Sequence, residues 1–220
     1  MSRQKITQDS DFDGHPIHTG NNQPYILNIL QAYNDRLQYM NRKYSQVAVA
    51  HIIVSTPEEL DPTQANKSIS KALEVLKKGL KNKGTEAQIG WVRESVDNTV
   101  SVAEEQRAHY HIGIIADGSK TQSGFGHAKH LGRLLHKQSG GVFSPGHAHC
   151  EPPDSEKYDK QAEYNQKKSS VIKIRRDKPH ADEQFENALN WLNYQSKIAT
   201  KGNAPHGQRE FGFTRLPKQE

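Results

Sequence analysis

Two histidines one residue apart offer the most specific chemistry in this sequence. His109 and His111 flank Tyr110 at the start of an apolar stretch that continues to Ile115. We expect residues 109–116 to form a strand, on which alternate side chains point to the same face. Two imidazoles on one face at that spacing can bind a single divalent cation. The alternative interpretation is that both side chains only line a solvated sheet face, because an isolated His-x-His pattern is common.

A carboxylate upstream can complete such a site. A Trp-Val-Arg-Glu motif ends at Glu94, and we expect residues 87–94 to form a strand before the one that carries the histidines. If the two strands are neighbours, Glu94 lies beside His109 and His111. A mixed set of imidazoles and a carboxylate favours Mn²⁺ or Mg²⁺ over a structural zinc, which prefers thiolates. The alternative is that Glu94 is a solvated charge at a strand end.

A tyrosine near the C-terminus is the candidate nucleophile. The apolar periodicity of residues 182–197 predicts an amphipathic helix, on which Tyr194 and Lys197 share a face. A nearby ammonium favours a phenolate, which is the nucleophile that a phosphotyrosyl intermediate requires. Tyr158 and Tyr164 are poorer candidates, because their charged surroundings offer little to fix a side chain. In the alternative interpretation the tyrosine of the helix packs its ring and the lysine faces solvent.

A second cluster of possible metal ligands lies downstream of the histidine pair. Its spacing matches no standard zinc finger and it offers only one thiolate, so we interpret its members as solvated loop residues. A zinc-dependent hydrolase that used them would also need a general base, which we cannot locate. The cluster consists of His127, His130, His136, His147, His149 and Cys150.

The elements that must position these residues follow from the apolar pattern of the chain. We expect the order helix, strand, helix, strand, strand, helix, strand, helix. The βαββαβ core inside that order predicts an α+β fold with a central antiparallel, RRM-like sheet and helices packed on one face. The opposite face would then be free to carry a site. We expect strands at 44–54, 87–94, 109–116 and 170–175, and helices at 24–43, 63–83, 126–137 and 182–197.

The composition sets further bounds. The 220 residues carry a net charge of +5, which is compatible with a nucleic-acid partner. The single cysteine fits a reducing cytoplasm, and no apolar run is long enough for a membrane span. We divide the chain into a flexible arm at 1–22, one domain at 23–215 with a loop-rich insertion at 139–168, and a tail at 216–220.

Taken together, the motifs resemble those of the HUH endonucleases, the initiators of rolling-circle replication. Within that class the chain is similar to the filamentous-phage (inovirus-type) replication proteins and the related YagK/YfjJ C-terminal domain family. The resemblance spans most of the chain and rests on five short motifs in order. These are Tyr-Ser before an apolar strand at 44–54, Trp-Val-Arg-Glu at 91–94, His-Tyr-His at 109–111, Tyr-x-x-Lys at 194–197 and Phe-Gly-x-x-Arg at 211–215.

The resemblance implies a nickase of phage, prophage or other mobile-element origin. It assigns a divalent cation, Mn²⁺ or Mg²⁺, to His109 and His111 with Glu94 as a third ligand. It makes Tyr194 the nucleophile, which forms a 5′-phosphotyrosine, and gives Lys197 the role of holding the phenolate or the phosphate. The implied partners are single-stranded DNA at a replication origin and the host replication machinery, with no membrane.

One departure from the family pattern supports a second interpretation. The first strand of the family often carries an acidic residue before a Leu or Pro, whereas residues 53–57 of this chain contain none. The alternative is therefore a DNA-binding or regulatory relative that keeps the fold and does not cut.

Overall fold

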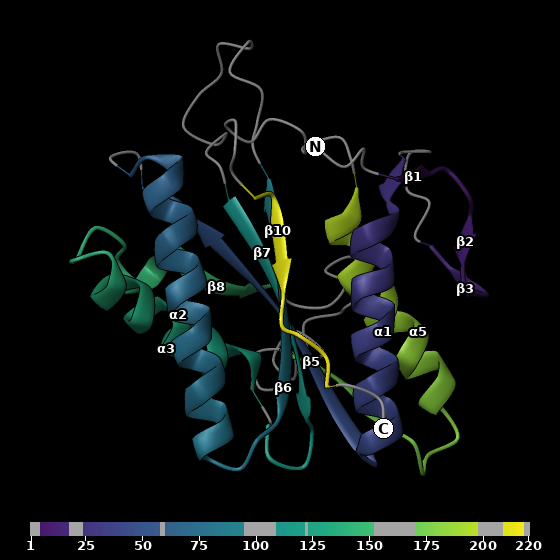
Figure 1. Cartoon of the computed structure of the whole chain (residues 1–220). Coiled ribbons are helices and arrows are strands. Elements are labelled where there is room, and N and C mark those ends of the chain that lie inside the picture. The colour runs from purple at the N-terminus through teal and green to yellow at the C-terminus, as the bar shows by residue number, and fades with distance from the viewer. Residues whose placement is uncertain are drawn as a thin grey trace, which may run out of the picture.

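A six-stranded antiparallel sheet forms the centre of the protein (Figure 1). This computed structural model describes residues 5–17, 24–57, 60–94, 109–121, 123–151, 170–197 and 209–217. Within these residues the expected mixed α+β class with a large antiparallel sheet is confirmed. The strands are β5 (Gln46–Ser55), β6 (Ala87–Glu94), β7 (His109–Asp117), β8 (Ala148–Glu151), β9 (Ile172–Arg175) and β10 (Phe211–Phe213).

The long strand β5 lies next to three others. The sheet order is β10-β6-β7-β5-β8, and β9 also pairs with β5. The edge of β5 away from β7 is divided, because residues 51–54 pair with β8 and residues 46–49 pair with β9. The sequence did not indicate β8 or β10 as strands. Both are short, and their pairing partners are distant in the chain.

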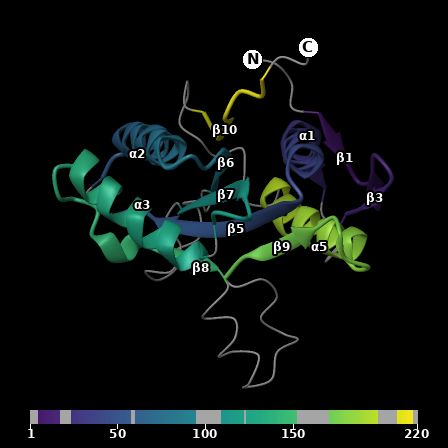
Figure 2. The same ribbon diagram turned by 90° about the horizontal axis from the view of Figure 1, so that it is seen from below.

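Helices cover both faces of the sheet, which corrects the expectation that they would pack on one face only. The helices are α1 (Leu27–Lys43), α2 (Pro62–Asn82), α3 (Gly124–Gln138) and α5 (Ala181–Asn193). Helices α2 and α3 pack against one face, and α1 and α5 against the other (Figures 1 and 2).

The reason for two covered faces is that the sheet strands are apolar on both sides. On β5, Ala50 and Ile52 point into the core under α2 and α3, whereas Val47 and Val49 point into the core under α1 and α5. A strand that is apolar at successive positions must be covered twice to remove its side chains from water. Helices α1 and α5 therefore cover the face of the sheet that carries the histidines.

The helix ends follow from local sequence. Helix α2 starts at Pro62, and the N-cap Asp61 side chain accepts a hydrogen bond from the Thr63 backbone N–H at 2.7 Å. Helix α3 is capped in the same way by Ser123, which accepts from the Gly126 N–H at 3.1 Å. Helix α5 ends at Asn193, earlier than we expected, and a 3₁₀ turn, η3 (Tyr194–Ser196), follows it.

Residues 5–17 form structure within the segment that we expected to be a flexible arm. Strand β1 (Ile6–Thr7) pairs with β4 (Tyr25–Ile26), and β2 (Asp11–Phe12) forms a hairpin with β3 (His15–Pro16). The hairpin contacts α5, because His15 Nδ1 lies 2.6 Å from Glu186 Oε1. These contacts attach the segment to the domain.

The expected insertion at 139–168 is described only in its first part. That part contains a 3₁₀ turn, η2 (Pro145–His147), and β8, which belongs to the central sheet. Residues 152–168 and the last tail residues, 218–220, lie outside the described residues. None of the helices in the described part of the chain combines the length and the hydropathy needed to cross a membrane.

Candidate metal and tyrosine site

Strand register gathers the predicted metal ligands on the face covered by α1 and α5. Glu94 of β6 is the direct partner of His109 on β7, and Val92 is the partner of His111. Because side chains alternate along a strand, His109, His111 and Glu94 all project from the same face of the sheet. This is the placement that the hairpin between the two strands predicted.

The carboxylate of Glu94 lies between the two histidines. Its Oε2 atom is 3.1 Å from His109 Nε2 and 3.1 Å from His111 Nε2. One ligand atom from each of the three residues lies within 4.8 Å of the other two, so the group can hold a metal ion. His111 and Glu94 are buried, and His109 is partly exposed, which leaves an approach from solvent.

The protonation of His111 suits a metal ligand. Burial, together with the neighbouring His51 and His109, lowers its pKa, although Glu94 acts in the opposite direction. An imidazole must be neutral to coordinate a cation. In addition, the His111 Nε2 atom is buried and lies 3.1 Å from Glu94 Oε2, so the two atoms can share a cation. The residues present therefore fit a metal ion.

Tyr194 lies beside this cluster. Its ring centroid is 6.3 Å from that of His111, and the two ring planes meet at 62°. Helix α5 brings it there, because Leu189 and Leu192 are buried against the sheet face that carries the histidines. The Tyr194 side chain is 43 % exposed, so a substrate can reach it from solvent.

The turn that carries Tyr194 is fixed by buried neighbours. The Tyr33 hydroxyl of α1 donates a hydrogen bond of 2.6 Å to Gln195 Oε1, and both side chains are buried. Tyr33 can reach this position because the β7 residue in contact with its ring is a glycine, Gly113. A Cβ on Gly113 would lie 2.8 Å from Tyr33 Cε1 and 2.7 Å from Leu192 Cδ2. The turn is therefore held by a close packing of α1, α5 and β7.

Lys197 also lies at the site, but with an electrostatic effect different from the one we expected. Its Nζ atom lies over the Tyr194 ring, 4.1 Å from the centroid, in a cation–π arrangement. We expected the ammonium to lower the pKa of Tyr194. Instead, burial raises the pKa of Tyr194, and the charges of Glu94 and Glu151 raise it further. The carboxylates around the ring oppose the phenolate.

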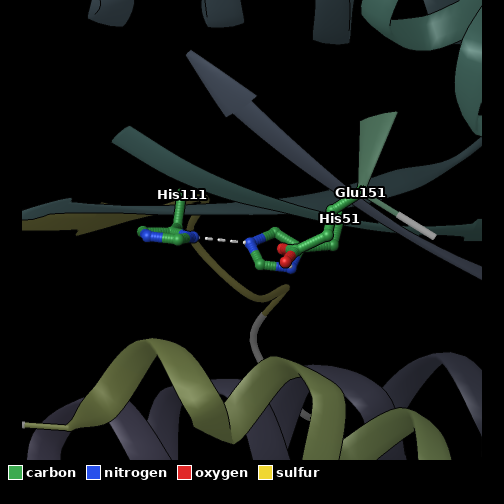
Figure 3. A group of neighbouring side chains, drawn as sticks. All are labelled: His51, His111 and Glu151. Atoms are coloured by element: carbon green, nitrogen blue, oxygen red, sulfur yellow. Dashed lines mark hydrogen bonds and ion pairs between the residues drawn. The ribbon is translucent and has the colours of Figure 1, made fainter. Parts of the chain in front are cut away.

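Two residues that sequence reasoning missed extend the site. His51 on β5 lies with its Nε2 atom 2.9 Å from His111 Nδ1, and its Nδ1 atom is 2.9 Å from Glu151 Oε2 on β8. These three residues form a second group that can hold a metal ion (Figure 3). Burial acts to raise the pKa of Glu151, but its contact with His51 and the nearby histidines outweigh burial and lower it.

A signal for His51 was present in the sequence. An imidazole in the middle of the apolar residues 47–54 is unusual. Because side chains alternate along a strand, His51 lies on the same face as Val47 and Val49, which is the face that carries the histidine pair. Glu151 had no comparable signal, because it belongs to a strand of four residues inside the expected insertion.

The downstream histidines and Cys150 contribute to neither group of ligands found in the described residues. His136 Nδ1 contacts the Phe143 carbonyl oxygen at 2.8 Å, and His147 Nδ1 accepts from the Ser144 N–H at 2.9 Å. Cys150 is buried, which raises the pKa of its thiol to about 11. These contacts give His136 and His147 local structural roles.

Comparisons with protein-family models, with curated proteins and with solved structures found no match. Function is therefore inferred from the motifs and from the geometry of Glu94, His109, His111 and Tyr194.

Proposed function

We propose that this chain is an HUH-type endonuclease that nicks and rejoins single-stranded DNA during rolling-circle replication. The observation that carries the proposal is the position of Tyr194 next to His111, one of three residues that can hold a cation. A half-exposed tyrosine beside such a group is the arrangement that a metal-assisted phosphotyrosyl transfer requires. Neither the His-Tyr-His motif nor the tyrosine alone would support this function.

The arrangement of the core supports the same class of protein. Elements β5, α2, β6, β7, α3 and β8 follow one another in the chain, which is the βαββαβ order. Strands β6, β7, β5 and β8 lie in that order across the sheet, with antiparallel neighbours. Helices α2 and α3 pack on the same face. These relations favour the RRM-like topology that the resemblance implies, to which α1 and α5 add a second helical layer.

The proposed reaction transfers a phosphoryl group from DNA to the protein. The Tyr194 Oη atom forms a bond to phosphorus, and the bond between phosphorus and the 3′ oxygen breaks. The phenolic proton leaves to solvent and the departing oxygen takes up a proton, which yields a 5′-phosphotyrosine and a free 3′-OH. Attack by a 3′-OH on the phosphotyrosine reverses these steps and rejoins the strand.

Each site residue has a defined part in this scheme. Glu94, His109 and His111 would hold Mn²⁺ or Mg²⁺, which supplies positive charge to the phosphate and offsets the carboxylates that oppose the phenolate. Lys197 adds a cation beside the Tyr194 ring, where the phosphate must bind.

The proposed partner is single-stranded DNA at a replication origin of a phage, a prophage or another mobile element, with the host replication machinery acting on the free 3′-OH. Lys173 and Arg175 of β9, together with Arg176, are candidate contacts to the DNA backbone, because phosphate contacts are made mainly by lysine and arginine. Arg215, near β10, is a fourth candidate.

Covalent adduct formation tests the proposal. The full chain is incubated with single-stranded oligonucleotides and MnCl₂, and the products are separated on a denaturing gel. We expect a protein–DNA adduct with the wild type and with Tyr158→Phe and Tyr164→Phe, and none with Tyr194→Phe. If the wild type binds the DNA but forms no adduct, the non-cutting DNA-binding relative replaces the nickase.

A further inference from the structure

Two buried histidines and a partly exposed glutamate lie in a row behind the proposed metal site. From β8 to β7 they are Glu151, His51 and His111 (Figure 3). His51 is 0 % exposed, and its two ring nitrogens face different partners, Nε2 toward His111 Nδ1 and Nδ1 toward Glu151 Oε2. The Trp191 ring of α5 covers His51, with ring centroids 5.6 Å apart. Solvent therefore does not reach the imidazole that joins the other two residues.

With a cation on His111 Nε2, the order of groups in this row admits one favourable arrangement of protons. If His111 uses Nε2 as a metal ligand, its neutral ring carries the proton on Nδ1. That N–H then donates to Nε2 of His51, so the proton of neutral His51 lies on Nδ1 and faces the Glu151 carboxylate. Every N–H in this arrangement points at an acceptor.

The opposite arrangement is unfavourable because of Glu151. A proton on Nε2 of His51 would donate to His111 Nδ1 and leave His51 Nδ1 as a bare lone pair, 2.9 Å from a carboxylate oxygen. Two acceptors at that distance repel each other, and burial removes the water that would separate them. It would also move the His111 proton to Nε2, from which it would donate to Glu94 Oε2 at 3.1 Å. The metal-free row therefore has a carboxylate acceptor at each end, and a cation bound to Nε2 excludes this second arrangement.

We propose that His51 and Glu151 are positioning residues that fix the tautomer and orientation of His111 so that its Nε2 atom serves the metal site. The inference rests on the proposed function only in that Glu94, His109 and His111 bind a cation. It also gives a physical reason for a buried imidazole in the middle of β5. Residues that donate or accept through the second nitrogen of a metal-bound histidine raise metal affinity in this way.

Two substitutions of His51 separate positioning from packing. In His51→Gln the side-chain amide oxygen can take the place of Nε2 and still accept from His111. In His51→Asn the shorter amide reaches the place of Nδ1, next to Glu151, but not His111. We expect Mn²⁺ affinity, measured from free Mn²⁺ by electron paramagnetic resonance, to stay within a few-fold of wild type in the Gln variant. It should fall about 10–100-fold in the Asn variant.

The tautomers of His51 and His111 provide a second test. A residue that only packed against His111 would not control which of its ring nitrogens carries the proton. In ¹⁵N-histidine NMR spectra recorded at a pH where the imidazoles are neutral, we expect His111 and His51 of the Mg²⁺-loaded chain to carry their protons on Nδ1. In the metal-free chain Glu94 and Glu151 compete for these protons, so Glu151→Gln should shift His111 toward the Nε2-protonated form, because it removes the carboxylate at one end only. An unchanged tautomer ratio in metal-free Glu151→Gln would overturn the inference, as would equal Mn²⁺ affinity in the wild type and the Gln and Asn variants.

The Mn²⁺ titration also separates this inference from the proposed function. Binding of two Mn²⁺ per chain, with one lost in Glu151→Gln, would mean that the three residues are themselves a cation site and would overturn the positioning role. Absence of Mn²⁺ binding by the wild type would overturn the metal site and the inference together. Mn²⁺ binding with the expected tautomers, but without a DNA adduct, would support the inference and contradict the nickase.

Discussion

The ring of Tyr194 meets the ring of His111 at an angle of 62°, with their centroids 6.3 Å apart. This contact joins the turn after α5 to the first half of β7, two elements that are far apart in the chain. It places the candidate nucleophile on the sheet face that carries Glu94 and His109, with 43 % of Tyr194 still exposed to solvent.

Metal binding should stabilise the fold through Glu94. At a Mn²⁺ concentration of about 100 times the dissociation constant, the wild type should gain about 2.7 kcal/mol of unfolding free energy. Glu94→Gln should lose most of this gain, because it removes the charge between His109 and His111. Thermal unfolding with MnCl₂ and with EDTA measures the effect. Glu74→Gln, an exposed substitution on α2, is the control, and a full Mn²⁺ response in Glu94→Gln would contradict the ligand assignment.

Lys197 should act on the reaction and not on the metal. Lys197→Met removes the cation above the Tyr194 ring, and we expect single-turnover adduct formation to slow about 10²-fold, with Mn²⁺ affinity unchanged. Lys197→Arg should retain most of the rate, because a guanidinium also stacks on an aromatic ring. If Lys197→Met reacts at the wild-type rate, Lys197 has no role in the reaction.

The hydroxyl of Tyr33 should hold the turn that carries Tyr194. In Tyr33→Phe the buried Gln195 loses its hydrogen bond, which should cost about 1–3 kcal/mol of unfolding free energy and slow adduct formation. Tyr39→Phe, on the same helix, loses a hydrogen bond to Glu86 away from the site and is the matched control. Slower adduct formation in the control but not in Tyr33→Phe would contradict this role.

The sequence could predict that Glu94, His109 and His111 lie together because their placement depends on local rules. The alternation of side chains puts His109 and His111 on one face, and the short connection between two strands puts Glu94 beside them. The position of Tyr194 also followed from the apolar stripe of α5, which includes Leu189 and Leu192. These relations hold for any antiparallel hairpin with a helix packed across it.

The remaining features of the site depend on contacts that local patterns do not encode. Glu151 faces His51 only because residues 148–151 add to the far edge of β5, a pairing between segments that are distant in the chain. The covering of the histidine-bearing face by α1 and α5 depends on how four amphipathic helices are divided between two apolar faces. The raised pKa of Tyr194 reflects this burial and the two carboxylates gathered there.

Stability should fall in mild acid because of His127, a partly buried histidine away from the proposed site. Burial first, and the nearby His130 second, lower its pKa from 6.5 to about 4. Between pH 6.5 and pH 4, His127 is protonated in the unfolded chain but stays neutral in the folded chain. The contribution of His127 to the free energy of unfolding therefore decreases as the pH falls toward 4. The decrease should be about 1.4 kcal/mol per pH unit.

Urea unfolding of the wild type and His127→Gln at pH 7.5 and pH 5.5 measures this effect. The stability of the wild type relative to the variant should be lower at pH 5.5, because other titrating groups cancel in the difference. A difference that does not change with pH would show that His127 titrates normally in the folded protein.

Mass spectrometry of the covalent adduct decides whether Tyr194 attacks DNA. The wild type is trapped with a single-stranded oligonucleotide in MnCl₂, the DNA is trimmed by a nuclease, and the protein is digested and sequenced. We expect a residual 5′-phosphoryl nucleotide on Tyr194, in the peptide that also contains Lys197. A nucleotide on Tyr158, Tyr164 or any other residue would contradict it.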